Sequence, residues 1–184
     1  MKNNFLKIIP TQNDLEQIDY DLFCESLLVS IPQIENICKH IDSAVRHMCT
    51  TNIPNNYPIY QALGYSVDSY SSASEYASAV VEEINYKRDL LVVHHLFMQW
   101  YGNLKDKNKN LYLRNFVRNE HYQESRIPAM VQSFVKYLLI FSDVTMRDLM
   151  TNPYLYKIYT EEVINKKNKG EKKHDCSTDE RGHS

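Results

Sequence analysis

The chain has 184 residues but only four glycines and six prolines. This leaves little material for the repeated tight turns of an all-β sandwich or barrel. Long apolar runs are also missing: no stretch approaches the 18 residues of a membrane-spanning helix. The amino terminus, MKNNFLKIIPTQND, lacks the apolar core of a signal peptide. We therefore expect an all-helical protein that is located in the cytoplasm and does not enter a membrane.

Catalytic motifs are missing as well. The glycines at positions 64, 102, 170 and 182 are too scattered to build a phosphate-binding loop, and there is no Gly-x-Ser-x-Gly motif. His94 and His95 are adjacent, so they point about 100° apart on a helix and do not match the histidine spacing of zinc proteases. We interpret His94 as a hydrogen-bonded core histidine. The sequence predicts no catalytic residue, no enzyme activity and no cofactor.

The chain has four cysteines, which are Cys24, Cys38, Cys49 and Cys176. Because cysteine can bind metal ions, a metal site is an alternative that helix geometry can test. Cys38-Lys39-His40 and His47-Met48-Cys49 form a mirrored pair of Cys/His triplets. On a helix the two cysteines fall on one face and His40 and His47 on the opposite one, so the four cannot surround one tetrahedral zinc. We predict no metal site, and we expect the cysteines to be free thiols in an apolar stripe.

The longest pattern in the chain predicts one unbroken helix over residues 72–102. Ser72 and Glu75 have the spacing of a capping box, and Gly102-Asn103 offers a left-handed residue to end the helix. Two apolar ridges follow the helical period. The first ridge is Ala77, Val80, Val81, Ile84, Leu91, His94, Met98 and Tyr101, and the second is Leu90, Val93, Phe97, Trp100 and Leu104. We expect both ridges to be buried around this central helix.

The amino-terminal region, residues 1–49, is expected to form a helical hairpin. Thr11 or Asn13 would cap a first helix that runs to about Val29, and Ser30-Ile31-Pro32 would start a second one that runs to about Cys49. Residues 50–71 form a tyrosine-rich connection with Pro54, Pro58 and Gly64 and no sustained period. Its tyrosines suit packing against the long helix or, alternatively, a contact surface.

Residues 72–165 are expected to hold the long helix and a helix-turn-helix-like bundle. Asp106 would cap a helix in KNKNLYLRNFVRN, with Leu111, Phe116 and Val117 inward, and Ser125 would cap RIPAMVQSFVKYLLIF. The apolar side of the latter is Ile127, Met130, Val131, Phe134, Val135, Leu138, Leu139 and Phe141. A short helix in VTMRDLMT and a last helix from Asn152-Pro153 to Asn165 follow. Residues 166–184 are polar and unpatterned, which predicts a disordered carboxy-terminal tail.

Basic side chains gather in one segment of a chain whose net charge is −2. Residues 102–141 contain seven basic and three acidic side chains, which gives a net charge of +4 (7 − 3). Residues 1–71 contain four basic and eight acidic ones, which gives −4 (4 − 8). Such a localised basic region suits a contact with nucleic acid, and the alternative is an ordinary solvated helix surface.

The order of elements from Ser71 to Phe141 resembles the ArpU/RinA-type transcription regulators of phages in Gram-positive bacteria, which contain a sigma-factor-like helix-turn-helix. The counterparts here are SYSSASEY, the long helix, Leu104-Lys105-Asp106, LYLRNFVRN and the Ser125 helix, and NEHYQE stands where the family has a further short helix. The resemblance implies double-stranded DNA as a partner, and RNA polymerase or another host protein as a second one. The nucleic-acid-binding candidates are Lys107, Lys109, Arg114, Arg118, Arg126, Gln132 and Lys136.

The function expected from this reading is transcription regulation in a phage or another mobile element. The alternative is a non-enzymatic module that binds a host protein through a helical groove or through the tyrosine-rich connection. Salt dependence separates the two, because phosphate contacts weaken steeply as salt rises. The two apolar ridges of the long helix also suit a dimer seam, so a homodimer is a further expectation.

Overall fold

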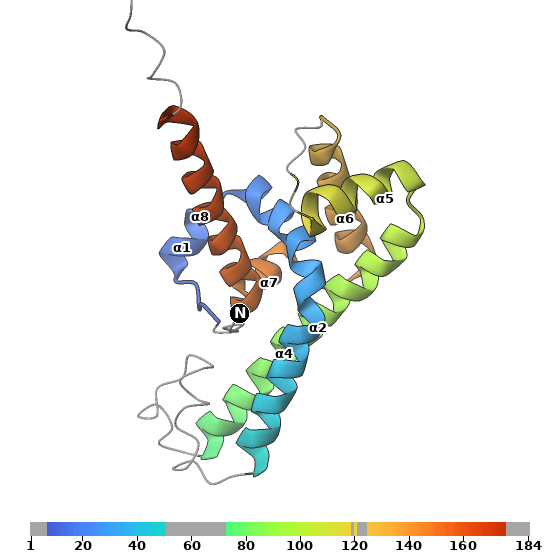
Figure 1. The fold of residues 1–184 in the computed structure, drawn as a ribbon. Helices are drawn as coiled ribbons and strands as arrows, with labels where there is room; N and C mark the ends of the chain where they lie inside the picture. Colours follow the sequence, from blue (N-terminus) through green and yellow to red (C-terminus); the bar gives the residue numbers. More distant parts are fainter. Residues whose placement is uncertain (1–6, 51–72, 119, 121–124, 176–184) are drawn as a thin grey trace, which may run out of the picture.

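The structure of the protein is a computed structural model, which describes residues 7–50, 73–118, 120 and 125–175. All regular secondary structure in these residues is helical, which confirms the all-α prediction (Figure 1). The elements are α1 (Gln12–Glu16), α2 (Tyr20–Thr50), α4 (Ala73–Gly102), α5 (Asp106–Tyr112), the π-helix η3 (Leu113–Val117), α6 (Ile127–Phe141), α7 (Met146–Thr151) and α8 (Pro153–Asp175).

The long helix predicted for residues 72–102 is confirmed as α4. It lies antiparallel to α2, and the two helices form the long arm of the molecule (Figure 1). The second of the two predicted ridges faces inward, because Leu90, Val93, Phe97 and Trp100 are all buried. Helix α6 packs on α4 and α2, and α8 packs on α2. The core is therefore built around α2 and α4 together.

The amino-terminal hairpin predicted for residues 1–49 is wrong. The chain breaks after Glu16, where α1 ends, and α2 then runs without interruption through Pro32 to Thr50. The partner of α2 in an antiparallel pair is therefore α4, and not a preceding helix. The sequence favours a helix start at Pro32, because a proline ring normally ends a helix in the interior.

Two details of the structure explain how α2 accommodates Pro32. A proline at this position cannot donate to the carbonyl of Leu28, and the hydroxyl of Tyr112 donates to that oxygen over 3.5 Å from the neighbouring segment. One turn earlier, Ser26 and Ser30 donate their hydroxyls to the carbonyls of Phe23 and Leu27, both over 2.7 Å. Such bonds to the preceding turn are associated with helix bending, which relieves the crowding around a proline.

The centre of the core is a cluster of aromatic rings from α4, α5 and α6. The ring centroid of Phe97 lies 4.9 Å from that of Tyr112, 5.7 Å from that of Phe134 and 5.9 Å from that of Trp100. These separations are in the range where tilted and edge-to-face pairs are favourable. The cluster fixes α5 and α6 against the second half of α4.

The first predicted ridge of α4 is largely exposed, which corrects the expectation that both ridges are buried. Val81 is 55% exposed, Ile84 51%, Leu91 46% and Met98 53%. Three further apolar residues predicted to face inward are exposed as well: Val117, Leu139 and Phe141. The exposure of Val117 follows from the π-helix, because its i→i+5 turn inserts one residue relative to an α-helix and rotates the following side chain.

Helix ends follow the predictions only in part. Ser125 does not cap α6, since Arg126 stands at the N-cap and makes no side-chain capping bond; likewise Lys105, and not Asp106, precedes α5. At the end of α4, Gly102 is outside the left-handed region, and the side chain of Asn103 donates to the carbonyl of Gln99 over 3.1 Å. The predicted capping box of Ser72 and Glu75 lies outside the described residues.

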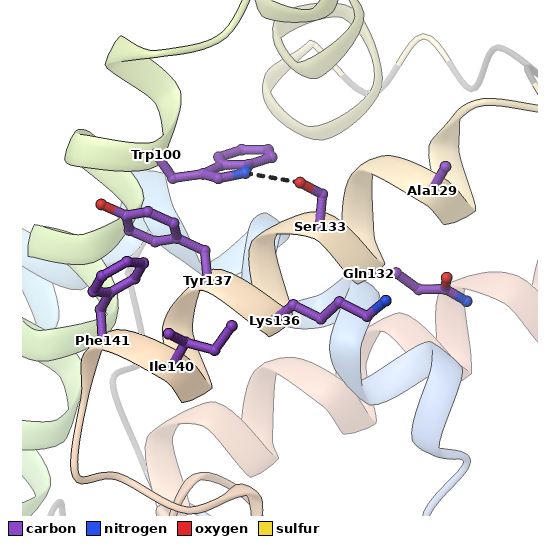
Figure 2. Close-up of a pocket in the computed structure, with 8 residues that line it drawn as sticks. All are labelled: Trp100, Ala129, Gln132, Ser133, Lys136, Tyr137, Ile140 and Phe141. Atoms are coloured by element: carbon purple, nitrogen blue, oxygen red, sulfur yellow. Dashed lines mark hydrogen bonds between the residues drawn. The ribbon is translucent and has the colours of Figure 1, made fainter.

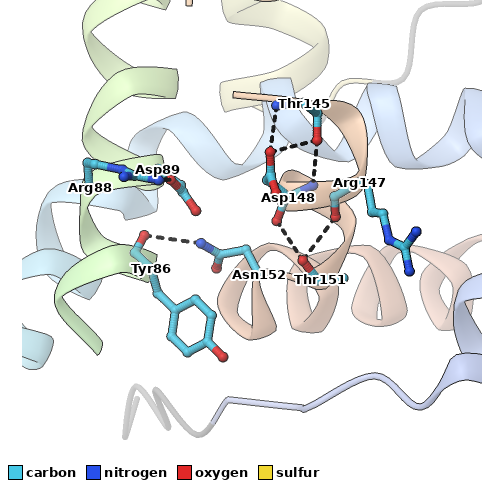
Figure 3. A network of polar contacts seen from close by, with 8 residues as sticks. All are labelled: Tyr86, Arg88, Asp89, Thr145, Arg147, Asp148, Thr151 and Asn152. Carbon is cyan, nitrogen blue, oxygen red and sulfur yellow. Dashed lines mark hydrogen bonds and ion pairs between the residues drawn. The ribbon is translucent and has the colours of Figure 1, made fainter. Parts of the chain in front are cut away.

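The start of the last helix, predicted at Asn152 and Pro153, is confirmed. The carboxamide oxygen of Asn152 accepts from the backbone N–H of Tyr154 over 3.2 Å, and its amide donates to the carbonyl of Tyr86 on α4 over 3.1 Å. Figure 3 shows this bond beside the capping box that Thr145 and Asp148 form at the start of α7. Asn152 thus caps α8 and also attaches it to α4.

A short segment before α1 is attached to the core by a buried ion pair. Lys7 Nζ lies 2.5 Å from Glu83 Oε1, and the two side chains are 1% and 0% exposed. The other carboxylate oxygen of Glu83 accepts the hydroxyl of Tyr154 over 2.7 Å. The backbone N–H of Ile8 donates to the carbonyl of Pro153 over 3.2 Å. Residues 7–11 therefore bridge α4 and the start of α8.

The carboxy-terminal boundary differs from the prediction. Helix α8 continues past Asn165 to Asp175, so the predicted tail begins inside a helix, and residues 176–184 lie outside the described residues. The tyrosine-rich connection at residues 50–71 also lies outside them, apart from Thr50 at the end of α2. Among the described helices, none is long and apolar enough to cross a membrane.

Candidate nucleic-acid interface

Helix α6 buries its large apolar side chains and exposes its polar ones over its first three turns, where Pro128 and Ala129 are exposed as well. Its apolar side is buried and consists of Met130, Val131, Phe134, Val135 and Leu138. The opposite side is exposed and carries Gln132, Ser133 and Lys136, with Arg126 just before the first turn. Figure 2 shows Gln132 and Lys136 extending from α6 in the same direction. The predicted recognition helix therefore presents a polar face to solvent, as a reader of DNA grooves requires.

Helix α5 supplies the two predicted lysines. Lys107 is exposed, whereas Lys109 is half-buried and places its Nζ 5.8 Å from the ring centroid of Tyr101 on α4. That separation is within the range of a cation–π contact. The contact draws Lys109 toward the end of α4 and leaves Lys107 as the more accessible of the two cations.

Arg114 and Arg118 are brought together, but by a carboxylate of the same segment. Arg114 Nε donates to Glu120 Oε2 over 3.0 Å, and Arg118 Nη1 lies 3.9 Å from Glu120 Oε1. All three side chains are well exposed, so the ion pairs are screened by solvent and each is worth less than about 1 kcal/mol. Because these ion pairs are weak, a phosphate group can compete with Glu120 for both arginines. Glu120 is one of the three acidic side chains already counted in the net charge of this segment, and the structure places it directly against two of the seven basic ones.

Acidic residues also lie close to the α6 candidates. A cavity of about 400 Å³ between α2 and α6 is lined by Gln132 and Lys136 on one side and by Asp21 and Glu25 on the other. Glu25 is paired with Lys166 Nζ on α8 over 2.6 Å. The positive face is thus bounded by α2, and any contact with phosphate is restricted to the side of α6 that faces away from it.

A second surface lies on the other side of Lys136, where α6 meets the end of α4. Trp100, Tyr137, Ile140 and Phe141 line a groove of about 420 Å³ together with Ala129, Gln132, Ser133 and Lys136 (Figure 2). Trp100 Nε1 donates to Ser133 Oγ over 3.2 Å, and the ring centroids of Tyr137 and Phe141 are 4.5 Å apart. An apolar floor with a polar rim suits an apolar anchor side chain of another molecule.

The two Cys/His triplets considered for a metal site both lie on the single helix α2, as does Cys24, whereas Cys176 lies outside the described residues. Cys24 and Cys38 are buried, as expected, whereas Cys49 is exposed, which corrects the prediction for that thiol. In the residues that the structure describes, no group of three or more histidine, cysteine, aspartate or glutamate side chains is arranged to hold a metal ion. Of the two adjacent histidines, His95 contacts Gln99 Nε2 over 2.9 Å, and His94 is half-buried.

Thiol reactivity should follow this burial. Desolvation raises the pKa of Cys24 to about 11, and it also raises the pKa of Cys38. In a Cys176→Ser variant at pH 8, we expect Cys49 to react with Ellman's reagent on the order of 100-fold faster than Cys24, because only thiolates react. Absorbance of the released thionitrobenzoate, followed before and after denaturation, measures the two phases. Three fast thiols in the folded protein would contradict the structure.

Sequence reasoning missed two features of these surfaces. The first is the pairing of Glu120 with Arg114 and Arg118. The closeness of the three residues in the sequence could have indicated this pairing, whereas no sequence pattern indicated the π-helix that orients the arginines. The second is the exposure of the first apolar ridge of α4, because helical spacing predicts both ridges as core and does not indicate which of the two another helix covers. Only the packing of α2 against the other ridge decides this.

Comparisons of the chain with protein-family models, curated proteins and solved structures find no match.

Proposed function

We propose that the chain is a non-enzymatic regulator that binds double-stranded DNA through α6 and α5. The observation that carries the proposal is the polar outer face of α6, where Arg126, Gln132 and Lys136 are exposed while the apolar side is buried. Arginine and lysine contact phosphates, and glutamine has the donor and acceptor needed to read a base edge. Lys107 on α5 adds a further exposed cation. The resemblance of residues 71–141 to phage regulators supports the same function.

Salt-dependent DNA binding tests this proposal. We expect the purified chain to bind a mixed set of fluorescent duplexes, with log Kd rising linearly with log salt. The charge reversal Arg126→Glu/Lys136→Glu should weaken binding by at least about tenfold and reduce the salt slope by about 0.9 for each phosphate that is no longer neutralised. The matched control is Lys39→Glu/Lys167→Glu, which reverses two exposed lysines on α2 and α8. Fluorescence anisotropy at about 50 and 200 mM salt, the range over which phosphate binding weakens most visibly, measures the effect.

A gain-of-function variant sharpens the test. Glu120→Gln removes the carboxylate that contacts Arg114 and Arg118. If these arginines reach phosphate, the variant should bind DNA at least about twofold more tightly, because it removes two surface ion pairs. Absence of binding at the lower salt concentration, or an equal loss in the α2/α8 control variant, would contradict DNA binding through this face.

A second candidate function is binding of another protein in the groove between α4 and α6. The observation that favours it is the exposure of Ile140 (72%) and Phe141 (62%) at the groove edge. An apolar contact of this kind should keep its affinity as salt rises, in contrast to phosphate binding. Its disruption by Ile140→Asp, with no effect of Arg126→Glu, would separate it from DNA binding.

A further inference from the structure

Helix α4 exposes a regular apolar seam on the side that faces away from the core. The seam consists of Val81, Ile84, Arg88, Leu91, His95 and Met98, and we call it the outer seam. Its four apolar members are each about half-exposed, between 46% and 55%. The opposite ridge of the same helix is fully used by the core. The apolar side chains of the outer seam therefore form an exposed surface that the core of the chain does not bury.

The spacing of the outer seam is that of a coiled coil. Its members are separated alternately by three and four residues, which is the a/d pattern of a heptad repeat. Over residues 81–98 the pattern persists for about 26 Å of helix, at 1.5 Å for each residue. A strict period of 3.5 keeps one line of side chains facing a single partner helix, whereas a surface helix against a broad core follows a period of 3.6. This indicates that the occupant of the seam is another helix.

The size of the surface fits a dimer contact. Phe141, which is 62% exposed, lies beside Ile84, Leu91 and His95 in a groove of about 560 Å³. With about 200 Å² for each large side chain, the exposed fractions of the four seam residues and Phe141 amount to roughly 500 Å² of apolar area. Arg88 and His95 add polar area. The total approaches the roughly 800 Å² that each partner contributes to a standard interface.

The charged position of the seam, Arg88, decides how a second copy would be arranged. In a parallel pair, Arg88 would face Arg88 of the second copy, and two like charges at a seam position are unfavourable. In an antiparallel pair, one register places Arg88 opposite Leu91, Ile84 opposite His95 and Val81 opposite Met98. In this register the numbers of two facing residues add up to 179. The guanidinium of Arg88 is held by Asp89 Oδ1 over 3.0 Å, so its aliphatic part can cover Leu91 of the second copy.

We propose that the outer seam pairs antiparallel with the outer seam of a second copy of this chain, which makes a two-fold symmetric homodimer. The contact is isologous, since each residue meets its complement on the other copy. It uses a face of α4 and not the polar face of α6. The dimer is therefore independent of DNA binding, and the two can be tested separately.

The first test is the mass of the full chain in solution. Sedimentation equilibrium at about 100 µM should give twice the chain mass of 21.7 kDa. Leu91→Lys places a cation opposite Arg88 of the second copy and should weaken association at least about 100-fold, while Leu91→Glu places an anion there and should weaken it less. A parallel pair sets position 91 against itself, so it predicts equal effects. The control is Val117→Lys, at an apolar residue 47% exposed on η3.

The second test fixes the register. In a background with Cys49→Ser and Cys176→Ser, a mixture of the Val81→Cys and Met98→Cys chains should form a disulfide-linked dimer on mild oxidation. Each chain alone should not, because its two copies of the cysteine lie about 26 Å apart along the helices. Linkage of Val81→Cys to itself, equal effects of the two Leu91 variants, or a monomer mass for the wild-type chain would each overturn the proposal.

Discussion

Replacing Glu83 by glutamine is expected to lower the free energy of unfolding by about 3–5 kcal/mol, which is a large part of the stability of an ordinary domain. Lys7 lies against this carboxylate with almost no access to water. Glutamine keeps an acceptor for the Tyr154 hydroxyl, so the change removes the charge and little else. Lys7 must then remain charged without this carboxylate, although its Nζ still lies 5.5 Å from the ring centroid of Tyr86, or lose its proton. Chemical denaturation followed by circular dichroism measures the difference.

The loss of stability caused by Glu83→Gln has an upper bound, because Lys7 can give up its proton. Burial lowers the pKa of Lys7 below its ordinary value of 10.5, because desolvation outweighs the attraction of Glu83. Without Glu83, deprotonation of Lys7 at pH 7 costs at most about 5 kcal/mol, at 1.36 kcal/mol for each pH unit below 10.5. A loss of less than about 1 kcal/mol would show instead that residues 7–11 detach from α4 without disturbing the core.

An exposed ion pair in the same protein provides the matched control. Lys87 Nζ also lies 2.5 Å from a carboxylate, Asp42 Oδ1, but these side chains are 27% and 51% exposed. Asp42→Asn should therefore change stability by less than about 0.5 kcal/mol. The double variant Lys7→Met/Glu83→Gln should recover most of the loss, because no unpaired charge stays buried. Equal effects of Glu83→Gln and Asp42→Asn would contradict the structure.

The ion pair also illustrates how much of this fold is visible in the sequence. The glutamate lies seven residues before Leu90, in line with the buried ridge, but the ridge predicted from apolar spacing begins at Leu90 and does not include Glu83. Its partner is 76 positions away in a segment without a helical pattern. Local patterns therefore predicted α4, α6 and the start of α8, while the contacts between distant segments, including the attachment by Lys7, could not be read from spacing.

The same limit applies to the candidate site. Exposure of Gln132 and Lys136 follows from the apolar period of α6, and it was predicted correctly as the polar side of that helix. The environment of those residues was not predicted, since Asp21 and Glu25 come from a helix more than a hundred residues earlier. Charge counted by segment overlooks such neighbours, and it also overlooks the pairing of Arg114 with Glu120.

Pro32→Ala is expected to raise the free energy of unfolding by about 2 kcal/mol. Proline in a helix interior costs about 3 kcal/mol relative to alanine, and up to about 1 kcal/mol is returned because alanine makes the unfolded chain more flexible. The proline ring is exposed, so its removal leaves no cavity. The new backbone N–H at position 32 can donate to the carbonyl of Leu28. Gln33→Ala, at the next exposed position of α2, is the control and should change stability by less than about 0.5 kcal/mol.

The hydroxyl of Tyr112 should matter only while the proline is present. It is the donor to Leu28 in this structure, and burial raises the pKa of Tyr112, so the hydroxyl stays protonated. Tyr112→Phe in the wild-type chain removes this long bond of 3.5 Å and should cost about 0.5–1 kcal/mol. In the Pro32→Ala background the cost should fall by at least about 0.5 kcal/mol, because the carbonyl has a backbone donor. A double-mutant cycle from urea denaturation gives this coupling directly. Equal costs in both backgrounds would mean that α2 tolerates its proline by bending alone.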